Sequence, residues 1–438
     1  MTYPEQVREI LWKEISTISQ SASKYAVNPD SDFTRNRKLN LETLMRFLIS
    51  MQSGTTAHEL LKFFDYSTDT ITNSGFVQQR EKLLPEAFQQ LLYQFNSNFK
   101  FSTHSNKYRL LAVDGTEFNI ARNTDDPETY HPPTGRALKG FNSVYVTALF
   151  DLLNKTYLDC VIQPGKSKNE FRAICDLTQR YQSGDTPVFI GDRGTPSYNF
   201  FANATKNNIF YLVRTKDIHA KRLLGLSQLP EVIDSNIDLI ITRSNSKKKR
   251  LHPHLEHQYR FIDKKVAFDF IEHGSRDEYH LSLRVVRLEV SDGVFVSLVT
   301  NLPADRVQAS VLKEWYGLRW GIETSFRELK HTIGALNFIS KKVEFIKQEI
   351  WARLTLFNFC SLIASHVVID KLDSKHVYQI CCATAFKICI QFINRKEQEP
   401  PIDVVALIGR YTLPIRPRRR FERHHRFQLP SRFCYRHA

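Results

Sequence analysis

The chain has 438 residues, 42% of them hydrophobic, which is long enough for two or three domains with buried cores. Its formal net charge of +15 favours a polyanionic partner, with nucleic acid as the first candidate. The composition excludes wholesale disorder, a collagen-like repeat and a small disulfide-rich scaffold. The seven cysteines form no C-x-x-C pair, and their odd number argues against a disulfide framework.

A cytoplasmic location, without a membrane partner, is expected. The first ten residues carry Glu5, Arg8 and Glu9 in place of the basic and apolar regions of a secretory signal. The apolar segment 350–369 contains Arg353 and His366, which are costly at the centre of a bilayer. We therefore predict that it forms a buried core helix.

The first hundred residues have apolar side chains at helical spacing, and region 1–105 is expected to be helical and to bind DNA. Within it, segments 57–64 and 74–83 are predicted as two helices joined by a polar turn. Such a pair is typical of a helix-turn-helix DNA reader. Helix pairs with short turns are common in any helical domain, so the pattern alone favours that interpretation, and DNA contact stays open as the alternative.

Apolar runs over 109–113, 144–150, 156–162, 188–190 and 209–213 predict strands, with helices between them over 170–181 and 198–206. This order indicates an α/β fold with a mixed sheet flanked by helices. Segment 216–302 is a second β-rich block, interpreted as an insertion, and its basic run 247–250 includes Lys248. That run is interpreted either as a solvated loop or as a clamp on DNA.

After residue 303 the chain is predicted to be helical again, first over 307–336 and then from 343 to about 392. The tail 413–438 is rich in arginine, including Arg418, Arg419 and Arg420, with aromatic residues between the cations. This combination contacts phosphates and stacks on bases, so nucleic-acid contact is favoured over a solvated tail.

Two apolar runs each end in an aspartate next to glycine, at Asp114 and at Asp192. In open α/β sheets the ends of strands present side chains to ligands, because the strand is rigid and the following loop leaves access. An aspartate in such a place also serves as a helix cap or a turn residue, which is the alternative for each one alone.

Further along, Tyr316, Arg319, Glu323 and Lys330 fall within roughly 60° of one helix face at roughly 100° per residue. One carboxylate beside a phenol and two cations suits a site for a metal and a phosphate. The alternative is a solvated face on which Arg319 pairs with Glu323.

The helix matches Y-x(2)-R-x(3)-E-x(6)-K, the signature of the insertion-sequence-family-four group of bacterial DDE transposases, which this sequence resembles from about residue 40 to the tail. Asp114 in D-G-T and Asp192 in G-D-R-G match the two upstream acidic positions of that group. The β-rich block before the glutamate also matches.

This resemblance implies a ribonuclease-H-like core over 106–215 and 303–340, interrupted by the β-rich insertion, with helical N-terminal and C-terminal regions, the latter over 341–412. Asp114 lies on its first strand, Asp192 on its fourth and Glu323 on a later helix. The three carboxylates hold two Mg²⁺ ions, with Mn²⁺ as an alternative, since a cluster of negative charge needs cations.

The implied activity is cleavage and strand transfer of double-stranded DNA, at the inverted-repeat ends of an insertion sequence and into target DNA, by a homodimer in the synaptic complex. Tyr316, Arg319 and Lys330 contact phosphates. Phe295 is the candidate to stack on an unpaired base, or a residue of the sheet core. Arg193 contacts phosphate or pairs with a carboxylate. Two rival functions stay open: a catalytically silent DNA-binding relative, and a nuclease of the same fold without strand transfer.

Overall fold

The structure is a computed structural model that describes residues 1–35, 37–52, 54–105, 107–134, 139–182, 184–244, 257–335, 338, 340–369, 376–396 and 398–415. The predicted DNA contacts Lys248, Arg418, Arg419 and Arg420 lie outside the described residues.

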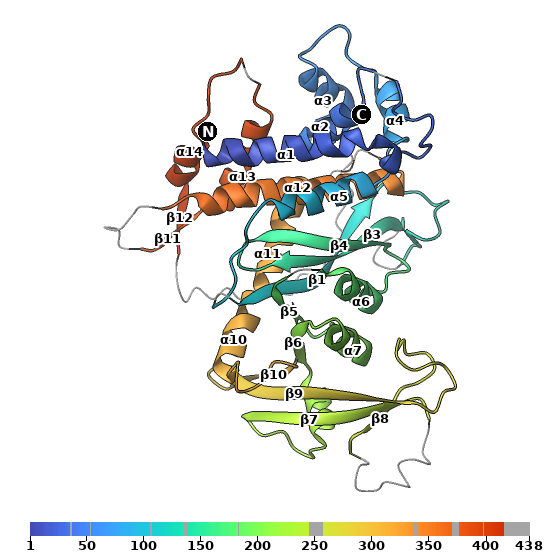
Figure 1. Ribbon diagram of the computed structural model, residues 1–438, viewed down its shortest axis with the longest axis vertical. Coiled ribbons are helices and arrows are strands. Elements are labelled where there is room, and N and C mark those ends of the chain that lie inside the picture. The colour runs from blue at the N-terminus through green and yellow to red at the C-terminus, as the bar shows by residue number, and fades with distance from the viewer. Residues whose placement is uncertain are drawn as a thin grey trace.

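A mixed sheet forms the centre of the protein and confirms the predicted α/β class (Figure 1). β1 (Tyr108–Ile120), β3 (Phe141–Asp151) and β4 (Thr156–Pro164) are antiparallel neighbours, and the short β2 (Tyr130–His131) pairs with β3. β5 (Thr186–Gly191) is parallel to β1, and β6 (Phe210–Thr215) is parallel to β5. All five predicted strands of this region are thus present. Parallel strands need crossover connections, and the connections from β1 to β5 and from β5 to β6 each include a helix.

Successive side chains of a strand point to opposite faces of the sheet, so the apolar strands present a hydrophobic surface on both faces. Helices cover each of these faces. Leu110 and Ala112 belong to one buried cluster, whereas Leu111 and Val113 belong to the other. α6 (Glu170–Arg180) and α7 (Tyr198–Lys206) cover the second face, and they lie where helices are predicted over 170–181 and 198–206.

The opposite face carries a helical layer that joins the two ends of the chain. Figure 1 shows α1 (Tyr3–Gln20), α5 (Glu86–Ser97) and α12 (Val343–His366) side by side above the sheet. α12 is buried along nearly its whole length, so the prediction of a core helix is confirmed. No helix in the described ranges is long and apolar enough to span a membrane.

Smaller elements complete this layer. They are η1 (Ala22–Tyr25), α2 (Leu41–Ser50), α3 (Thr56–Phe63), α4 (Asn73–Arg80), α13 (Cys382–Ile393), α14 (Val404–Arg410) and the pair β11 (Tyr378–Ile380) and β12 (Thr412–Pro414). The helices α3 and α4 occur where the helix pair is predicted, and Thr55 and Thr72 cap them. The predicted helical stretch from 343 to about 392 is wrong in continuity, because β11 lies between α12 and α13.

The β-rich block continues the central sheet. Its strands are β7 (Ile233–Thr242), β8 (Tyr259–Phe261), β9 (Glu278–Ser291) and β10 (Val294–Thr300), and they follow α8 (Asp217–Leu224). β10 pairs with β6 and β9, and β9 pairs with β7, so these strands extend one edge of the sheet. That the block is an insertion relative to other proteins stays a prediction.

The predicted helix over 307–336 is divided into α10 (Ala309–Leu318) and α11 (Trp320–His331). At the junction, the amide of Arg319 donates to the carbonyl of Tyr316, and the amide of Ile322 donates to that of Arg319. These bonds span three residues, which tightens the turn. Gly317 and Gly321 flank the junction, and each weakens a regular helix by about 1 kcal/mol.

Candidate active site

Asp114 lies on β1 where the strand reaches the carboxyl edge of the parallel strands. Its neighbour Ala112 pairs with Ile190 of β5, so two further residues along each strand bring Asp114 beside Asp192. The Oδ1 atom of Asp114 accepts a hydrogen bond from the amide of Gly115 at 2.8 Å. Burial raises the pKa of Asp114 to about 6, helped by the negative charges of Asp192 and Glu170 and opposed by the Gly115 amide and by Arg319.

Asp192 is the first residue after β5. Its Oδ1 atom accepts from the amide of Gly194 at 2.6 Å, which fixes the carboxylate within the G-D-R-G turn. Gly191, just before it, has no room for a side chain, since an added Cβ would lie 2.3 Å from the hydroxyl of Thr195. The structure therefore brings the two predicted aspartates to neighbouring strand ends.

Arg319 connects Asp114 to Glu323. Its Nη2 atom lies 2.7 Å from Oε1 of Glu323, and its Nη1 atom lies 3.5 Å from Oδ2 of Asp114. The residue is only 5% exposed, so its charge is held against the sheet and not on a solvated face. Its Nε atom has no hydrogen-bond partner among the described residues. One guanidinium thus places the helix carboxylate next to the strand carboxylate.

The two other members of the helix signature lie on either side of this contact. Tyr316 is half-buried at the end of α10, with its ring centroid 5.9 Å from the guanidinium carbon of Arg319. Lys330 donates to the backbone carbonyl of Glu117 in β1 at 2.8 Å and lies over the ring of Phe118. Burial lowers the pKa of Lys330, and the charge of Glu117 opposes this. Two signature residues, Arg319 and Lys330, therefore contact β1 directly, at Asp114 and Glu117.

Two further predicted contacts, Arg193 and Phe295, lie within the described ranges. Arg193 is exposed next to Asp192. Phe295 is half-buried at the start of β10, and the guanidinium of Arg287 lies 4.7 Å from its ring centroid. One face of that ring is thus covered by a cation, and its predicted stacking on a base stays a prediction.

Sequence reasoning missed Glu170 and Tyr145. Glu170 is the first residue of α6, and burial raises its pKa, with a further increase from the charge of Asp192. The phenol of Tyr145, on β3, opposes this rise in the pKa of Glu170. The ring of Tyr145 lies so close to Gly115 that an added Cβ would be 2.1 Å from the phenol oxygen. The signal in the sequence was the acidic residue in the first turn after a strand, which a capping role explains equally well.

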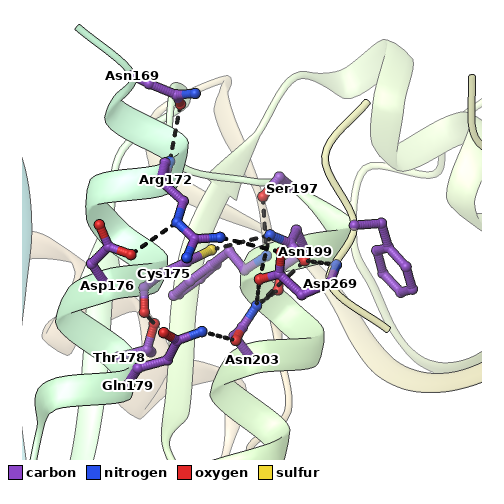
Figure 2. Close-up of polar contacts among 12 residues, drawn as sticks. Asn169, Arg172, Cys175, Asp176, Thr178, Gln179, Ser197, Asn199, Asn203 and Asp269 are labelled. Atoms are coloured by element: carbon purple, nitrogen blue, oxygen red, sulfur yellow. Dashed lines mark hydrogen bonds and ion pairs between the residues drawn. The ribbon is translucent and has the colours of Figure 1, made fainter. Parts of the chain in front are cut away.

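A polar network holds α6, and therefore Glu170, in place. Figure 2 shows α6 and α7 linked by Gln179 and Asn203, with a bond of 2.9 Å. Asp269, from the β-rich block, accepts from Asn199 at 3.1 Å and from Asn203 at 3.0 Å (Figure 2). The β-rich block is thereby joined to the core by side chains as well as by the sheet.

These residues suit a divalent cation in their chemistry. Carboxylate oxygens are the ligands that Mg²⁺ prefers, and the half-buried charges of Asp114 and Asp192 oppose each other until a cation neutralises them. Within the described ranges, however, no three His, Cys, Asp or Glu side chains are grouped closely enough to hold a metal as they stand. Arg319 stands between the carboxylates of Asp114 and Glu323, which accounts for this spacing.

Carboxylates at adjoining strand ends, with a buried arginine beside them, are groups of the kind that phosphoryl-transfer chemistry on an anionic substrate uses. The family model for the transposase DDE domain matches residues 105–359. The chain therefore belongs to the transposase DDE domain family, whose activity is that of a polynucleotidyl transferase or nuclease and which generally uses divalent metal ions.

None of the curated proteins matches this sequence. Among solved structures, the chain is similar to a piggyBac transposase, determined by cryo-electron microscopy in a synaptic complex with hairpin DNA. That similarity has a TM-score of 0.45 and 10% identity, and it covers 90% of this chain and 80% of the other.

The raised pKa of Asp114 predicts a dependence of stability on pH. Its pKa rises from 3.8 to about 6 on folding, so its contribution to stability is present below pH 4 and is lost as the pH rises through 6. The loss is on the order of 3 kcal/mol. Thermal unfolding of the wild type and of Asp114→Asn, measured from pH 4 to pH 8, should show a fall in the wild type that the variant lacks.

Mg²⁺ should offset this loss. At pH 8 the ion should raise the melting temperature of the wild type and leave that of Asp114→Asn nearly unchanged, because ion binding to the folded state stabilises it. If Mg²⁺ changed the melting temperatures of the wild type and of the variant by the same amount, Asp114 would not be a residue that binds the ion.

Proposed function

We propose that this transposase cuts both inverted-repeat ends of an insertion sequence and joins them to target DNA, as a member of the insertion-sequence-family-four group. The observation that carries the proposal is the contact of Arg319 with both Asp114 and Glu323, beside Asp192. These are the positions at which the sequence resembles that group. The order and directions of β4, β3, β1, β5 and β6 support a ribonuclease-H-like core.

In this proposal Asp114, Asp192 and Glu323 hold two Mg²⁺ ions, or Mn²⁺, at the carboxyl edge of the sheet. Bound there, the ions supply charge that stabilises the attacking and leaving oxygens of a displacement at phosphorus. Because the same carboxylates serve a water molecule or a DNA 3′-hydroxyl as the attacking group, cleavage and joining share one site. Asp114 must be ionised for this role, so at Mg²⁺ concentrations below saturation activity should increase as the pH rises through about 6.

Arg319 and Lys330 are proposed to hold phosphates of the transposon end, with Tyr316 beside them. Arg319 offers a planar pair of N–H groups and Lys330 a single point charge. When a phosphate replaces one of its carboxylate partners, Arg319 keeps its position against the sheet and exchanges one anion for another. Two protomers, one for each end, are proposed to form the synaptic complex.

The decisive experiment is a strand-transfer assay with purified protein, Mg²⁺ and DNA carrying the inverted repeats that flank the coding sequence. Cleavage at the repeat ends followed by joining to a target plasmid would support the proposal. Cleavage without joining would indicate a nuclease of the same fold, and specific binding without cleavage would indicate a catalytically silent relative. DNA ends with scrambled repeats are the matched control.

Replacing Arg319 by alanine should weaken complexes with end DNA. The logarithm of affinity should also fall less steeply with the logarithm of salt concentration, with a slope smaller by about 1, since one phosphate contact is lost. The control is Arg410→Ala, which removes the same charge from an exposed position on α14. An unchanged slope in Arg319→Ala would assign this arginine to structure alone.

A further inference from the structure

A second group of cations lies on the other side of the catalytic carboxylates, along β6. β5 and β6 are parallel, and their register pairs Gly191 with Val213. The next residue on each strand is therefore Asp192 beside Arg214, at the usual strand separation of about 4.8 Å. Ile190 and Leu212 both belong to the buried cluster that contains Ala112, and side chains two residues further point to the same face. Arg214 therefore adjoins Asp192 on the face that carries Asp114.

Arg214 has two cationic neighbours at this edge, Arg193 and Lys216, and we call the three the β6 cations. Arg214 is half-buried, whereas Arg193 and Lys216 are exposed. None of the ion pairs between described residues includes a β6 cation. Their charges are available for an anion from outside the chain.

Besides Asp192, the acid that adjoins these cations along the chain is Asp217, which is already engaged. Asp217, next to Lys216, is 3.3 Å from the guanidinium of Arg287 and accepts a hydrogen bond from the hydroxyl of Ser297 at 2.8 Å. These contacts direct its carboxylate toward β9 and β10. The β6 cations therefore keep their positive charge at the carboxyl edge of the sheet.

The carboxylates thus lie between two cationic groups. On the β1 side are Arg319, which contacts Asp114, and Lys330, which is bonded to the backbone of β1. On the β6 side are the three β6 cations. A DNA strand whose reacting phosphate lies at the carboxylates continues in two directions, and each direction meets cations.

We infer that the β6 cations bind backbone phosphates of the duplex DNA that lies across the reacting phosphate from the transposon end. This DNA is the flanking sequence before cleavage and the target sequence during joining, which share the same chemistry. The inference rests on the proposed function, in which the β1 side holds the transposon end. Since cations contact phosphates without reading bases, this surface would position such DNA and would not select its sequence.

The test compares Lys216→Gln and Arg214→Gln with the wild type on three DNAs. The first is an inverted-repeat end with flanking duplex, the second is the same end already cut, and the third is the cut end with a target duplex. Each variant should bind the flanked end about 3- to 10-fold more weakly, with a salt slope smaller by about 1. Binding to the cut end should not change, and joining to the target should fall by a similar factor.

Lys216 is exposed, so its replacement should not disturb folding if the half-buried Arg214 proves intolerant. The matched control is Lys206→Gln at the end of α7, an exposed lysine at the opposite edge of the same strand–helix–strand unit. If only binding to the flanked end weakens, the surface binds flanking DNA. If only joining to the target slows, the surface binds target DNA. Either result supports the inference.

The inference would be overturned if the variants bound the cut end as weakly as the flanked end, or if neither binding nor joining changed with any of the three DNAs. The proposed function fails separately, since its failure requires that the wild type neither cuts nor joins inverted-repeat ends. A wild type that cuts and joins, alongside unchanged Lys216→Gln and Arg214→Gln, would leave the function standing and remove only the role of the β6 cations.

Discussion

Replacing Asp114 by asparagine should reduce the rate of end cleavage by about a thousandfold or more, because charge stabilisation by a bound metal is worth several kcal/mol in the transition state. Asp192→Asn and Glu323→Gln should cause losses of the same order. In each variant Arg319 keeps at least one carboxylate partner and Lys330 keeps its bond to the backbone of β1, so both cations stay in place for the proposed phosphate contacts. Affinity for end DNA should therefore stay nearly unchanged. Single-turnover cleavage and a binding titration measure the two quantities separately.

A loss of activity caused by misfolding can be told apart from this result. Asp114→Asn removes a buried carboxyl whose pKa is raised to about 6, so the variant should be more stable than the wild type at pH 8 without metal. An inactive but stabilised protein therefore indicates a catalytic role. Asp30→Asn, an exposed acid in the N-terminal region, is the control and should cut normally. Nicking retained by any of the three active-site variants would contradict the assignment.

The core strands were predictable because their signals are local. Each is a short run of apolar residues, and two of the runs end in an aspartate beside a glycine, at Asp114 and Asp192. The pairing of β10 with β6 was not predictable in this way, because it joins residues far apart in the chain. Periodicity shows that a segment is a strand, but the partner of that strand depends on contacts that no local pattern contains.

The site was predictable in its members but not in its arrangement. Helical periodicity placed Arg319 and Glu323 on one face of a single helix, whereas in the structure Arg319 lies at the junction of two helices and also contacts Asp114 of β1. Glu170 was missed because its proximity to Asp192 arises from the crossover after β4. The residue pattern of one segment does not show which charged side chains from other segments will lie beside it in the fold.

Arg80 and Glu349 form a buried ion pair that should contribute strongly to stability. Arg80 is 1% exposed and Glu349 is 2% exposed, and they are 3.0 Å apart. Arg80 also donates to Gln348 at 2.8 Å and to the carbonyl of Phe345 at 2.6 Å. Replacing Arg80 by alanine should lower the free energy of unfolding by about 3 to 5 kcal/mol, because the carboxylate of Glu349 is left buried without its partner. Urea denaturation measures this loss.

The neighbouring residues on the same two elements provide a matched control. Lys342 and Glu81 form an ion pair whose side chains are 61% and 43% exposed, and Lys342→Ala should cost no more than about 1 kcal/mol. The double replacement of Arg80 by methionine and Glu349 by leucine should cost less than Arg80→Ala, since no charge is left unpaired. If Arg80→Ala lowered the free energy of unfolding no more than Lys342→Ala does, the buried pair would not be the contact that stabilises the packing of α4 against α12.

This pair also connects the two regions that the proposed reaction requires. Arg80 ends α4, the second helix of the candidate DNA reader, whereas Glu349 lies on α12, which packs against α5 and the sheet. Loosening α4 should weaken specific binding of inverted-repeat ends more than it slows cleavage of ends already bound. A comparison of end affinity and single-turnover rate in Arg80→Ala measures this difference. Equal effects on both would indicate that the N-terminal helices support the core without reading DNA.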